Sequence, residues 1–197
     1  EKELKLIEDA ARTCYKSESH NATSGKELIR SLILSGHHAM IEHGPSLTVE
    51  FNVDRGFTHE MVRHRLFSFA QESTRYCNYT KEKFSGVKFT DIADQMVLDS
   101  KVSSMPLEKQ LYIYQYWLNC CLESEQHYEA MIKMGCSPQI ARSVLIHSVN
   151  ATLRVTGNYR EWRNALDLRC AVNAHPCMRV IMRPLLKELN EKIPVIF

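Results

Sequence analysis

Residues 46–54, which read Ser-Leu-Thr-Val-Glu-Phe-Asn-Val-Asp, decide the fold of this chain. Apolar side chains at 47, 49, 51 and 53 alternate with polar ones, and this period of two predicts a β-strand that buries one face. A second strand is expected over residues 150–159, which carry the β-branched Thr152, Val155 and Thr156. The two stretches predict a small antiparallel sheet.

Helical periodicity surrounds these strands. One helix follows Ser24, because apolar residues recur at 28, 29, 32 and 33, Glu27 completes a capping box and Gly36 ends the segment. Further helices are expected over residues 4–11, from Thr58 through Arg65, from Met105-Pro106 to Met134 before Gly135, from Ser137 to Ile146, from Arg160 to Cys170, and from Pro176 to Leu189 with a kink at Pro184. The stretch from Ser68 to Tyr79 lacks a clean period and is predicted as a loop.

The expected fold class is therefore α+β, with one helix-rich domain spanning residues 1–197 around a small antiparallel sheet. The aromatic residues of the long helix are expected to lie in the core; they are Tyr112, Tyr114, Tyr116 and Trp117.

The composition argues against several classes of protein. Of 197 residues 44% are apolar, enough for one core, and 25 basic against 23 acidic side chains leave a net charge of only +2. Bulk attraction to nucleic acid or to an anionic membrane is therefore weak, and no apolar run has the length of a membrane span. Seven cysteines without a C-x-x-C pair fit neither a disulfide framework nor a zinc knuckle, and favour the reducing cytoplasm.

Arginine is concentrated in one part of the chain. From Cys136 to Leu186 there are seven arginines and no lysine, opposed only by Glu161 and Asp167. A planar guanidinium suits bidentate contacts to phosphate, carboxylate or a base edge. A basic helix face in water explains any single arginine as well, and an RNA-binding module that uses the arginines with Tyr159 and Trp162 is the alternative from another class.

A zinc site is the first alternative for the segment that begins His59-Glu60. Zinc hydrolases place two histidines four residues apart on one helix face, but here the second, His64, is five residues on and Arg63 takes the required position. An arginine beside a dication is also electrostatically unfavourable. We therefore expect no metal, and helix-terminal or polar roles account for the other candidates, which are His37, His38 and His43.

The densest group of functional side chains is Arg63-His64-Arg65, which is followed by Ser68, Gln71, Glu72, Ser73 and Arg75. Consecutive helical residues point about 100° apart, so the triplet would fan over roughly 200° and would not serve one pocket. Two explanations stay open. Either some of these side chains are solvated surface, or the triplet lies where two sites or two subunits meet.

Arg63-His64-Arg65, seven residues and then Ser73 reproduce an R-H-R-x7-S signature, and in this the chain resembles the flavin-dependent thymidylate synthases. Other segments match that family in the same order: Gly36-His37 with Glu42-His43, Ser73-x-Arg75-Tyr76, Ile140-Ala141-Arg142, and Asn158, Arg160, Asn164 and Leu168-Arg169 in an N-x-R-x3-N-x4-R spacing. The resemblance runs from about Ala11 to the C-terminus and implies a fold like that of the thymidylate synthase complementing proteins.

The resemblance implies a reductive methylation of dUMP to dTMP, with 5,10-methylenetetrahydrofolate as carbon donor and FAD, reduced by NADPH, as hydride donor. It implies a homotetramer with active sites shared between subunits. Such sharing would explain how the side chains of Arg63-His64-Arg65, which point in different directions, can all take part in active sites. Because the chain has no G-x-G-x-x-G turn, arginines and helix ends would hold FAD in place of a Rossmann unit.

The resemblance also assigns site residues. The nucleotide set, which would hold dUMP, is Glu60, Arg63, Gln71, Glu72, Ser73, Thr74, Arg75, Arg142 and Arg169. The flavin set is His37, Ala39, Arg63, His64, Arg65, Gln71, Asn158, Arg160, Asn164 and His175, of which His175 stands two residues further from Arg169 than in the family. Catalytic roles fall to Arg169, against the ionised pyrimidine, and to Ser73, as a hydrogen-bonding group.

Two positions depart from the family's pattern. The family commonly has Asn-Glu where this chain has Ala70-Gln71, and Gln where it has Glu60. A carboxylate accepts hydrogen bonds, so Glu60 would supply the acceptor for a ribose hydroxyl that Gln71 supplies less strongly. Glu72 is a rival for the same role.

Overall fold

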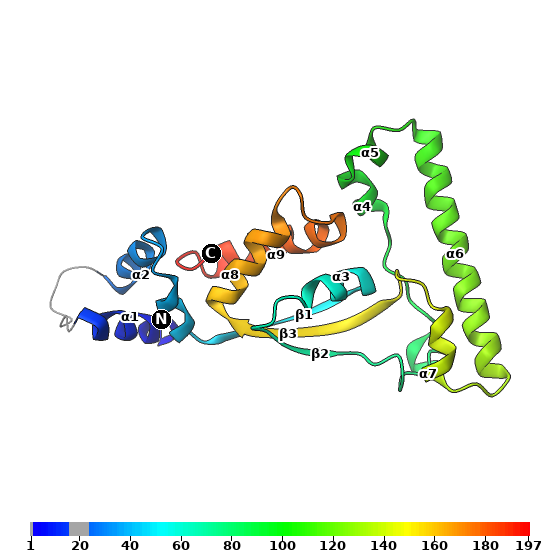
Figure 1. The fold of residues 1–197 in the computed structure, drawn as a ribbon, viewed down its shortest axis with the longest axis horizontal. Helices are drawn as coiled ribbons and strands as arrows, with labels where there is room; N and C mark the ends of the chain where they lie inside the picture. The colour runs from blue at the N-terminus through cyan, green and yellow to red at the C-terminus, as the bar shows by residue number, and fades with distance from the viewer. Residues whose placement is uncertain (1, 16–23) are drawn as a thin grey trace.

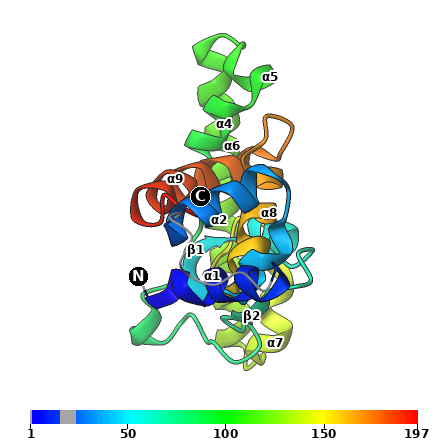
Figure 2. The ribbon, with the colours of Figure 1, turned by 90° about the vertical axis from the view of Figure 1, so that its left-hand side faces the viewer.

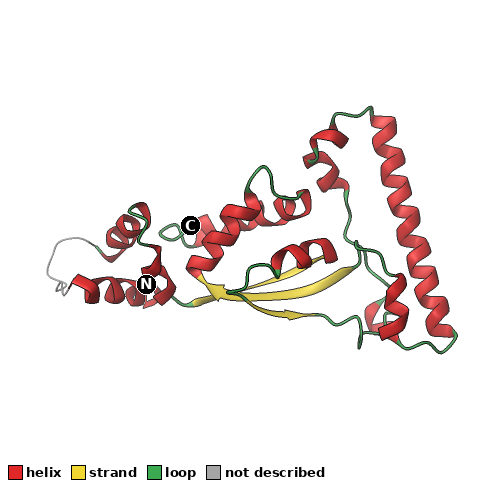
Figure 3. Cartoon of the chain, in the orientation of Figure 1, coloured by secondary structure: helices red, strands yellow, loops and turns green. Residues whose placement is uncertain are grey.

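The computed structural model describes residues 2–15 and 24–197 (Figures 1 and 3). Its strands are β1 (Ser46–Asp54), β2 (Ser68–Gln71) and β3 (Asn150–Asn158). Its helices are α1 (Lys2–Tyr15), α2 (Gly25–Leu34), α3 (Arg55–Met61), α4 (Ala93–Leu98), α5 (Ser100–Ser103), α6 (Leu107–Lys133), α7 (Pro138–Ala141), α8 (Tyr159–Cys170) and α9 (Pro176–Lys192), with short 3₁₀ helices η1 (His38–His43), η2 (Glu82–Phe84) and η3 (Arg142–Val144). The α+β class predicted from the sequence is confirmed.

The sheet has the order β1-β3-β2, and both pairs are antiparallel. Ser46 lies opposite Asn158 and Asp54 opposite Asn150, so β1 and β3 pair along their full lengths. Both predicted strands are therefore confirmed. The sheet has one apolar face, against which α3, α8 and α9 pack, and one polar face (Figure 1).

Trp162 of α8 is fully buried between these helices and the sheet. Its ring centroid is 4.6 Å from that of Phe67, and its indole Nε1 donates to the carbonyl of Leu47 at 3.0 Å. Gly157 makes this packing possible, because a Cβ there would come within 2.2 Å of the Phe67 ring. Truncating so large a buried side chain to alanine costs about 3–5 kcal/mol, so Trp162 is a main source of stability.

The N-terminal helices form a second cluster with the end of the chain. Ile7, Ile29 and Ile41 are buried there against Val195 and Ile196. The predicted capping box of α2 is present, because Ser24 Oγ accepts from Glu27 N and Glu27 Oε2 accepts from Ser24 N. Gly36, with φ of 75°, follows the end of the helix as predicted.

Helix α6 forms an arm beside the body, joining α4 and α5 at one end to α7 at the other (Figures 1 and 2). Its second half packs Tyr128 against Tyr79 and Val149. Its first half has apolar side chains on the outside as well, since Tyr112 is 59% and Tyr116 72% exposed in the single chain. The prediction that the aromatics of this helix lie in the core is wrong for these two.

Three local predictions also need correction. Helix α3 begins at Arg55, because Asp54 and not Thr58 accepts the capping hydrogen bond, from Phe57 N at 2.7 Å, and it ends at Met61, before the arginine–histidine triplet. Residues 68–71, predicted as loop, form the edge strand β2, since β3 supplies hydrogen-bonding partners that the local pattern does not reveal. The helix expected from Ser137 to Ile146 is only α7 and η3.

Across the described ranges 2–15 and 24–197, no helix is long and apolar enough to cross a membrane.

Candidate active site

The arginine–histidine triplet lies in the turn that links α3 to β2. His64 N donates to the carbonyl of Met61 at 3.1 Å, and Phe67 N donates to that of His64 at 3.3 Å. The His64 side chain points inward and the residue is only 6% exposed, whereas Arg63 and Arg65 are exposed. His64 therefore points into the protein, whereas the arginines on either side of it point toward solvent. The three residues lie in a turn, so the helical arrangement expected from the sequence does not form.

Four side chains meet around the inward histidine, and we call them the Arg169 cluster: Glu60, His64, Glu161 and Arg169. Arg169 Nε donates to His64 Nε2 at 2.9 Å, and Arg169 Nη2 donates to the backbone carbonyl of Glu60 at 2.9 Å. Arg169 Nη1 also pairs with the Glu60 carboxylate. On the other side of the ring, His64 Nδ1 lies 3.4 Å from Glu161 Oε1.

The ionisation of this cluster follows from burial. Burial lowers the pKa of His64 below its ordinary value of 6.5, and the charge of Arg169 lowers it further, while Glu60 partly offsets both. Burial raises the pKa of Glu161 above its ordinary value of 4.5, against the hydrogen bond from Asn164 and the charge of Arg160. At neutral pH the imidazole is therefore neutral, and the guanidinium of Arg169 is the fixed cation of the cluster.

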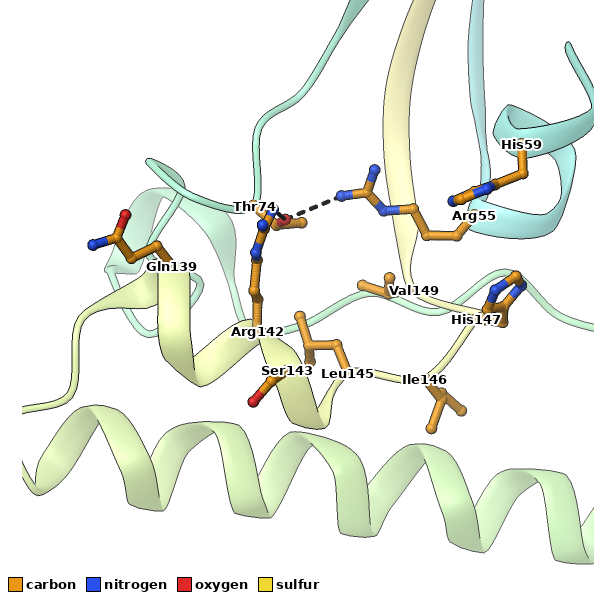
Figure 4. Close-up of a pocket in the computed structure, with 10 residues that line it drawn as sticks. All are labelled: Arg55, His59, Thr74, Gln139, Arg142, Ser143, Leu145, Ile146, His147 and Val149. Carbon is orange, nitrogen blue, oxygen red and sulfur yellow. Dashed lines mark hydrogen bonds between the residues drawn. The ribbon is translucent and has the colours of Figure 1, made fainter. Parts of the chain in front are cut away.

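A second candidate, the cationic pocket, has a volume of about 420 Å³ and lies between the β1–α3 corner and the α7–η3 segment (Figure 4). Arg55 Nη2 and Arg142 Nη1 both donate to the hydroxyl of Thr74, at 3.0 and 3.1 Å. His59 and His147 complete the wall, with ring centroids 5.6 Å apart. None of the ten described lining residues is a carboxylate, so the pocket suits an anion.

A third candidate, the amide pocket, also measures about 420 Å³ and lies at the N-terminus of α8. Asn158, Arg160 and Asn164, three residues of the predicted flavin set, line it together. Asn158 Oδ1 caps α8 by accepting from Glu161 N at 2.9 Å, and Arg160 pairs with the Glu42 carboxylate. Because Glu161 lines this pocket too, the Arg169 cluster borders it.

The cationic pocket and the amide pocket adjoin opposite ends of β3. Val149, just before the strand, lines the first, and Asn158, its last residue, lines the second. A nine-residue strand with a rise of about 3.3 Å per residue separates its ends by about 26 Å. One chain therefore does not bring both pockets to the same small molecule.

The remaining predicted residues occupy varied positions. Glu72 is engaged inside the chain, since Tyr79 Oη donates to its Oε1 at 2.8 Å, whereas the buried Nε2 of Gln71 has no partner among the described groups. His175 caps α9 by accepting from Cys177 N at 3.1 Å. Side chains at three other predicted positions are exposed, at His37, at Ala39 and at Arg75, which lies over the Tyr76 ring.

Sequence reasoning missed four residues of these sites: Arg55, His59, His147 and Glu161. Arg55 and His59 are four apart on α3, a spacing that would have placed them on one face had the start of the helix been predicted correctly. His147 and Glu161 come together with their partners only through the fold. Within residues 2–15 and 24–197, no three His, Cys, Asp or Glu side chains are placed to hold a metal.

The chain is a helix-rich α+β protein with two separate pockets, one lined by two arginines and one lined by asparagines, arginines and carboxylates. The sequence profile described as thymidylate synthase complementing protein matches residues 1–195, and the chain belongs to that family.

Curated relatives cover almost the whole chain. A protein of Corynebacterium aurimucosum is 30% identical over 98% of this chain and 78% of its own length, and one of Corynebacterium efficiens is 30% identical over 98% and 77%. One of Mycobacterium tuberculosis is 28% identical, again over 98% and 77%. All three bear the name flavin-dependent thymidylate synthase.

Proposed function

We propose that this chain is a flavin-dependent thymidylate synthase, which converts dUMP to dTMP with 5,10-methylenetetrahydrofolate as carbon donor and with FAD, reduced by NADPH, as hydride source. Family membership and the names of the relatives support the class of reaction. The observation that carries the residue assignments is Arg169, whose guanidinium is fixed by three hydrogen bonds beside the amide pocket.

The phosphate of dUMP would bind in the cationic pocket. Arg55 and Arg142 converge there on Thr74, so that two guanidinium groups are held close together without a carboxylate to neutralise them. A phosphate would receive charge-assisted hydrogen bonds from both. Ser73 and Arg75, on either side of Thr74 in the chain, would then contact the same nucleotide.

The pyrimidine ring would lie against Arg169. Methylation at C5 requires negative charge on the N3/O4 side of the ring, and a permanently charged, pre-oriented guanidinium stabilises that charge without reorganising. Glu60 and His64 hold the arginine from two sides. Exposed Arg63, next to His64 in the same turn, is placed to contact the nucleotide.

The amide and guanidinium groups of the amide pocket would suit a flavin, beside the carboxylates of Glu42, Glu161 and Asp167 that line the same pocket. Asn158, Asn164 and Arg160 offer amide and guanidinium donors, and the buried Nε of Arg163 has no partner among the described atoms. When bound, FAD supplies the hydride that reaches C6 of the ring. His37 and Ala39 lie at the start of η1, the 3₁₀ helix that also provides His38 and Glu42 to the pocket wall.

Two observations support a homotetramer with shared sites. The cationic pocket and the amide pocket adjoin opposite ends of β3, so one copy would supply the phosphate pocket and another the flavin pocket of the same active site. Helix α6 also exposes apolar side chains on two sides, since Leu107 and Leu111 lie on one side and Tyr116 about 140–180° around the helix from them, each more than 60% exposed. Large apolar side chains exposed in such number are normally covered, and a second copy of this chain would cover them.

The absorption spectrum of the purified protein tests this proposal. We expect oxidised-flavin bands that NADPH bleaches under anaerobic conditions, followed by dTMP formation when dUMP and methylenetetrahydrofolate are added. A colourless protein that takes up no added FAD would contradict the proposal. Strongly salt-dependent binding of oligonucleotides by such a colourless protein would favour the RNA-binding alternative.

A further inference from the structure

Glu161 is a buried carboxylate to which neither the sequence pattern nor the proposed reaction gives a role. Its side chain is 7% exposed, and that of His64, which it faces, is 5% exposed. Carboxylates are rarely buried to this extent unless they are paired.

The hydrogen bonds around the imidazole determine which nitrogen carries the proton. Arginine has only donors, so the contact of 2.9 Å from Arg169 Nε forms only in the tautomer in which His64 Nε2 presents its lone pair. A neutral imidazole then carries its proton on Nδ1. Nδ1 lies 3.4 Å from Glu161 Oε1, at the long end of hydrogen-bonding distance, and a carboxylate is an acceptor only.

Glu161 is held at its backbone and at its carboxylate. Asn158 Oδ1 accepts from Glu161 N at 2.9 Å and so fixes the residue in the first turn of α8, where the helix dipole favours an anion. Asn164 Nδ2 donates to Glu161 Oε2 at 3.4 Å. Both asparagines line the amide pocket, so Glu161 connects that pocket to His64.

We propose that Glu161 is a positioning residue, which holds His64 in the Nδ1-protonated tautomer so that Nε2 can accept from Arg169 and keep its guanidinium directed at the substrate. The inference deepens the proposed function and rests on it for the role of Arg169. In the opposite tautomer two N–H groups would face each other, and Arg169 would lose the hydrogen bond that orients its Nε edge.

Two variants separate this role from simple structural support. Glu161→Gln keeps a carbonyl oxygen for the Nδ1 proton, whereas Glu161→Leu keeps most of the side-chain volume and removes the acceptor. Met182→Ala is the control, because it opens a cavity in the core cluster around Trp162 without touching the imidazole. All three would be compared with the wild type by thermal unfolding first.

The first measurement is a long-range ¹H–¹⁵N spectrum of histidine-labelled protein as purified, with the His64 signals assigned by His64→Gln. We expect Nδ1 protonation in the wild type and in Glu161→Gln, and a change of tautomer or mixed tautomers in Glu161→Leu. An Nε2-protonated His64 in the wild type, or an unchanged signal in Glu161→Leu, would overturn the proposal. This measurement needs neither flavin nor dUMP, so it stands even if the protein makes no dTMP.

The second measurement is dTMP formation at saturating co-substrates. In Glu161→Leu we expect kcat to fall roughly tenfold or more, as is usual when a group that orients a site residue is lost, with KM for dUMP changed far less. Glu161→Gln should restore most of kcat, and Met182→Ala should keep it. Normal kcat in Glu161→Leu, or an equal loss in Met182→Ala, would refute a positioning role, whereas an inactive wild type would refute the proposed function alone.

Discussion

Arg169 donates a hydrogen bond of 2.9 Å from its Nε to Nε2 of His64, and this contact joins the two predicted sets of site residues. The sequence pattern places Arg169 with the nucleotide and His64 with the flavin. The structure brings them into one cluster at the border of the amide pocket. We therefore expect a change at either residue to affect the interactions with the nucleotide and with the flavin alike.

Replacing Arg169 by alanine should lower dTMP formation at saturating dUMP by about 10²–10³-fold, the loss seen when one group that stabilises developing charge is removed. Folding should suffer much less, because Glu60 is partly exposed and is solvated once its partner is gone. Arg169→Lys should also fail, since an ammonium group does not reproduce three directed hydrogen bonds. The measurement is kcat, alongside urea unfolding.

Arg154→Ala is the matched control for that experiment, because this arginine pairs with Glu50 on the polar face of the sheet. It should keep full activity. Near-normal turnover of Arg169→Ala would remove the arginine from the mechanism.

Arg55→Ala and Arg142→Ala should each weaken dUMP binding about tenfold, which corresponds to about 1.4 kcal/mol. The double variant should lose less than the sum of the two, because both guanidinium groups share the hydroxyl of Thr74 and so are coupled. Titration calorimetry with dUMP measures the effect, and deoxyuridine, which lacks the phosphate, is the control. Equal losses for both ligands would show that the cationic pocket does not bind the phosphate.

Strands β1 and β3 and most of the longer helices were predictable because their signals are local. The alternation at 46–54, the capping box at Ser24 and the proline at Pro176 each fix one element without reference to the rest of the chain. The start of α3 was predicted wrongly because the local sequence offers two good N-caps, Asp54 and Thr58. The choice between them depends on a distant contact, since the backbone N–H of Arg55 donates to the carbonyl of His147 at 3.0 Å.

Only those residues of the candidate site that belong to a recognisable sequence motif could be predicted. The signature identified the triplet and Ser73, but spacing along the chain does not say that His64 turns inward between two outward arginines. Glu161 was read only as one of two acids among many arginines. Its contact with His64 joins residues 97 positions apart (161 − 64), and no local pattern encodes that distance.

Tyr116→Glu should break the assembly, because it puts a charge into the exposed apolar face of α6. Light scattering should show a tetramer for the wild type and smaller species for the variant, and the variant should also lose its flavin. Gln126→Glu adds the same charge in the polar second half of the helix and should change neither property. A wild-type monomer that binds FAD tightly would show that the site is complete within one chain.

Acid should destabilise the wild type through His64. The pKa of His64 is lowered in the folded chain, first by burial and then by Arg169, so the unfolded chain binds the proton more readily. The contribution of His64 to the free energy of unfolding is therefore fully present above about pH 6.5. It is lost as the pH falls from there through the pKa of His64 in the folded chain.

Glu161 acts in the opposite direction. Because burial raises its pKa, the unfolded chain releases its proton more readily, and stability falls as pH rises through the interval above the ordinary value of 4.5. Urea unfolding of wild type and His64→Gln at several pH values, at one protein concentration, isolates the histidine contribution. The difference between them should change between pH 7 and pH 5, and a constant difference would mean that the pKa of His64 is the same in the folded and unfolded chains.

The final prediction concerns a covalent nucleophile, since addition of a side chain to C6 is the alternative way to activate uracil. Ser73 and Cys77 are the two candidates in the signature segment. Ser73 Oγ accepts from Arg75 N at 3.3 Å, and within the described chain no hydrogen bond links it to a histidine or carboxylate that would remove its proton. Burial raises the pKa of Cys77, and the charge of Glu72 raises it further, so little reactive thiolate forms.

Ser73→Ala should therefore bind dUMP more weakly and still make dTMP, and Cys77→Ser should keep most activity. Mass spectrometry of the protein incubated with dUMP or its 5-fluoro analogue under turnover conditions provides the direct test, with Cys120→Ser, which alters an exposed cysteine of α6, as the control variant. We expect no adduct on either residue. A covalent adduct on Ser73 or Cys77, together with complete loss of turnover in the matching variant, would replace charge stabilisation by Arg169 with nucleophilic catalysis as the way in which C5 is activated.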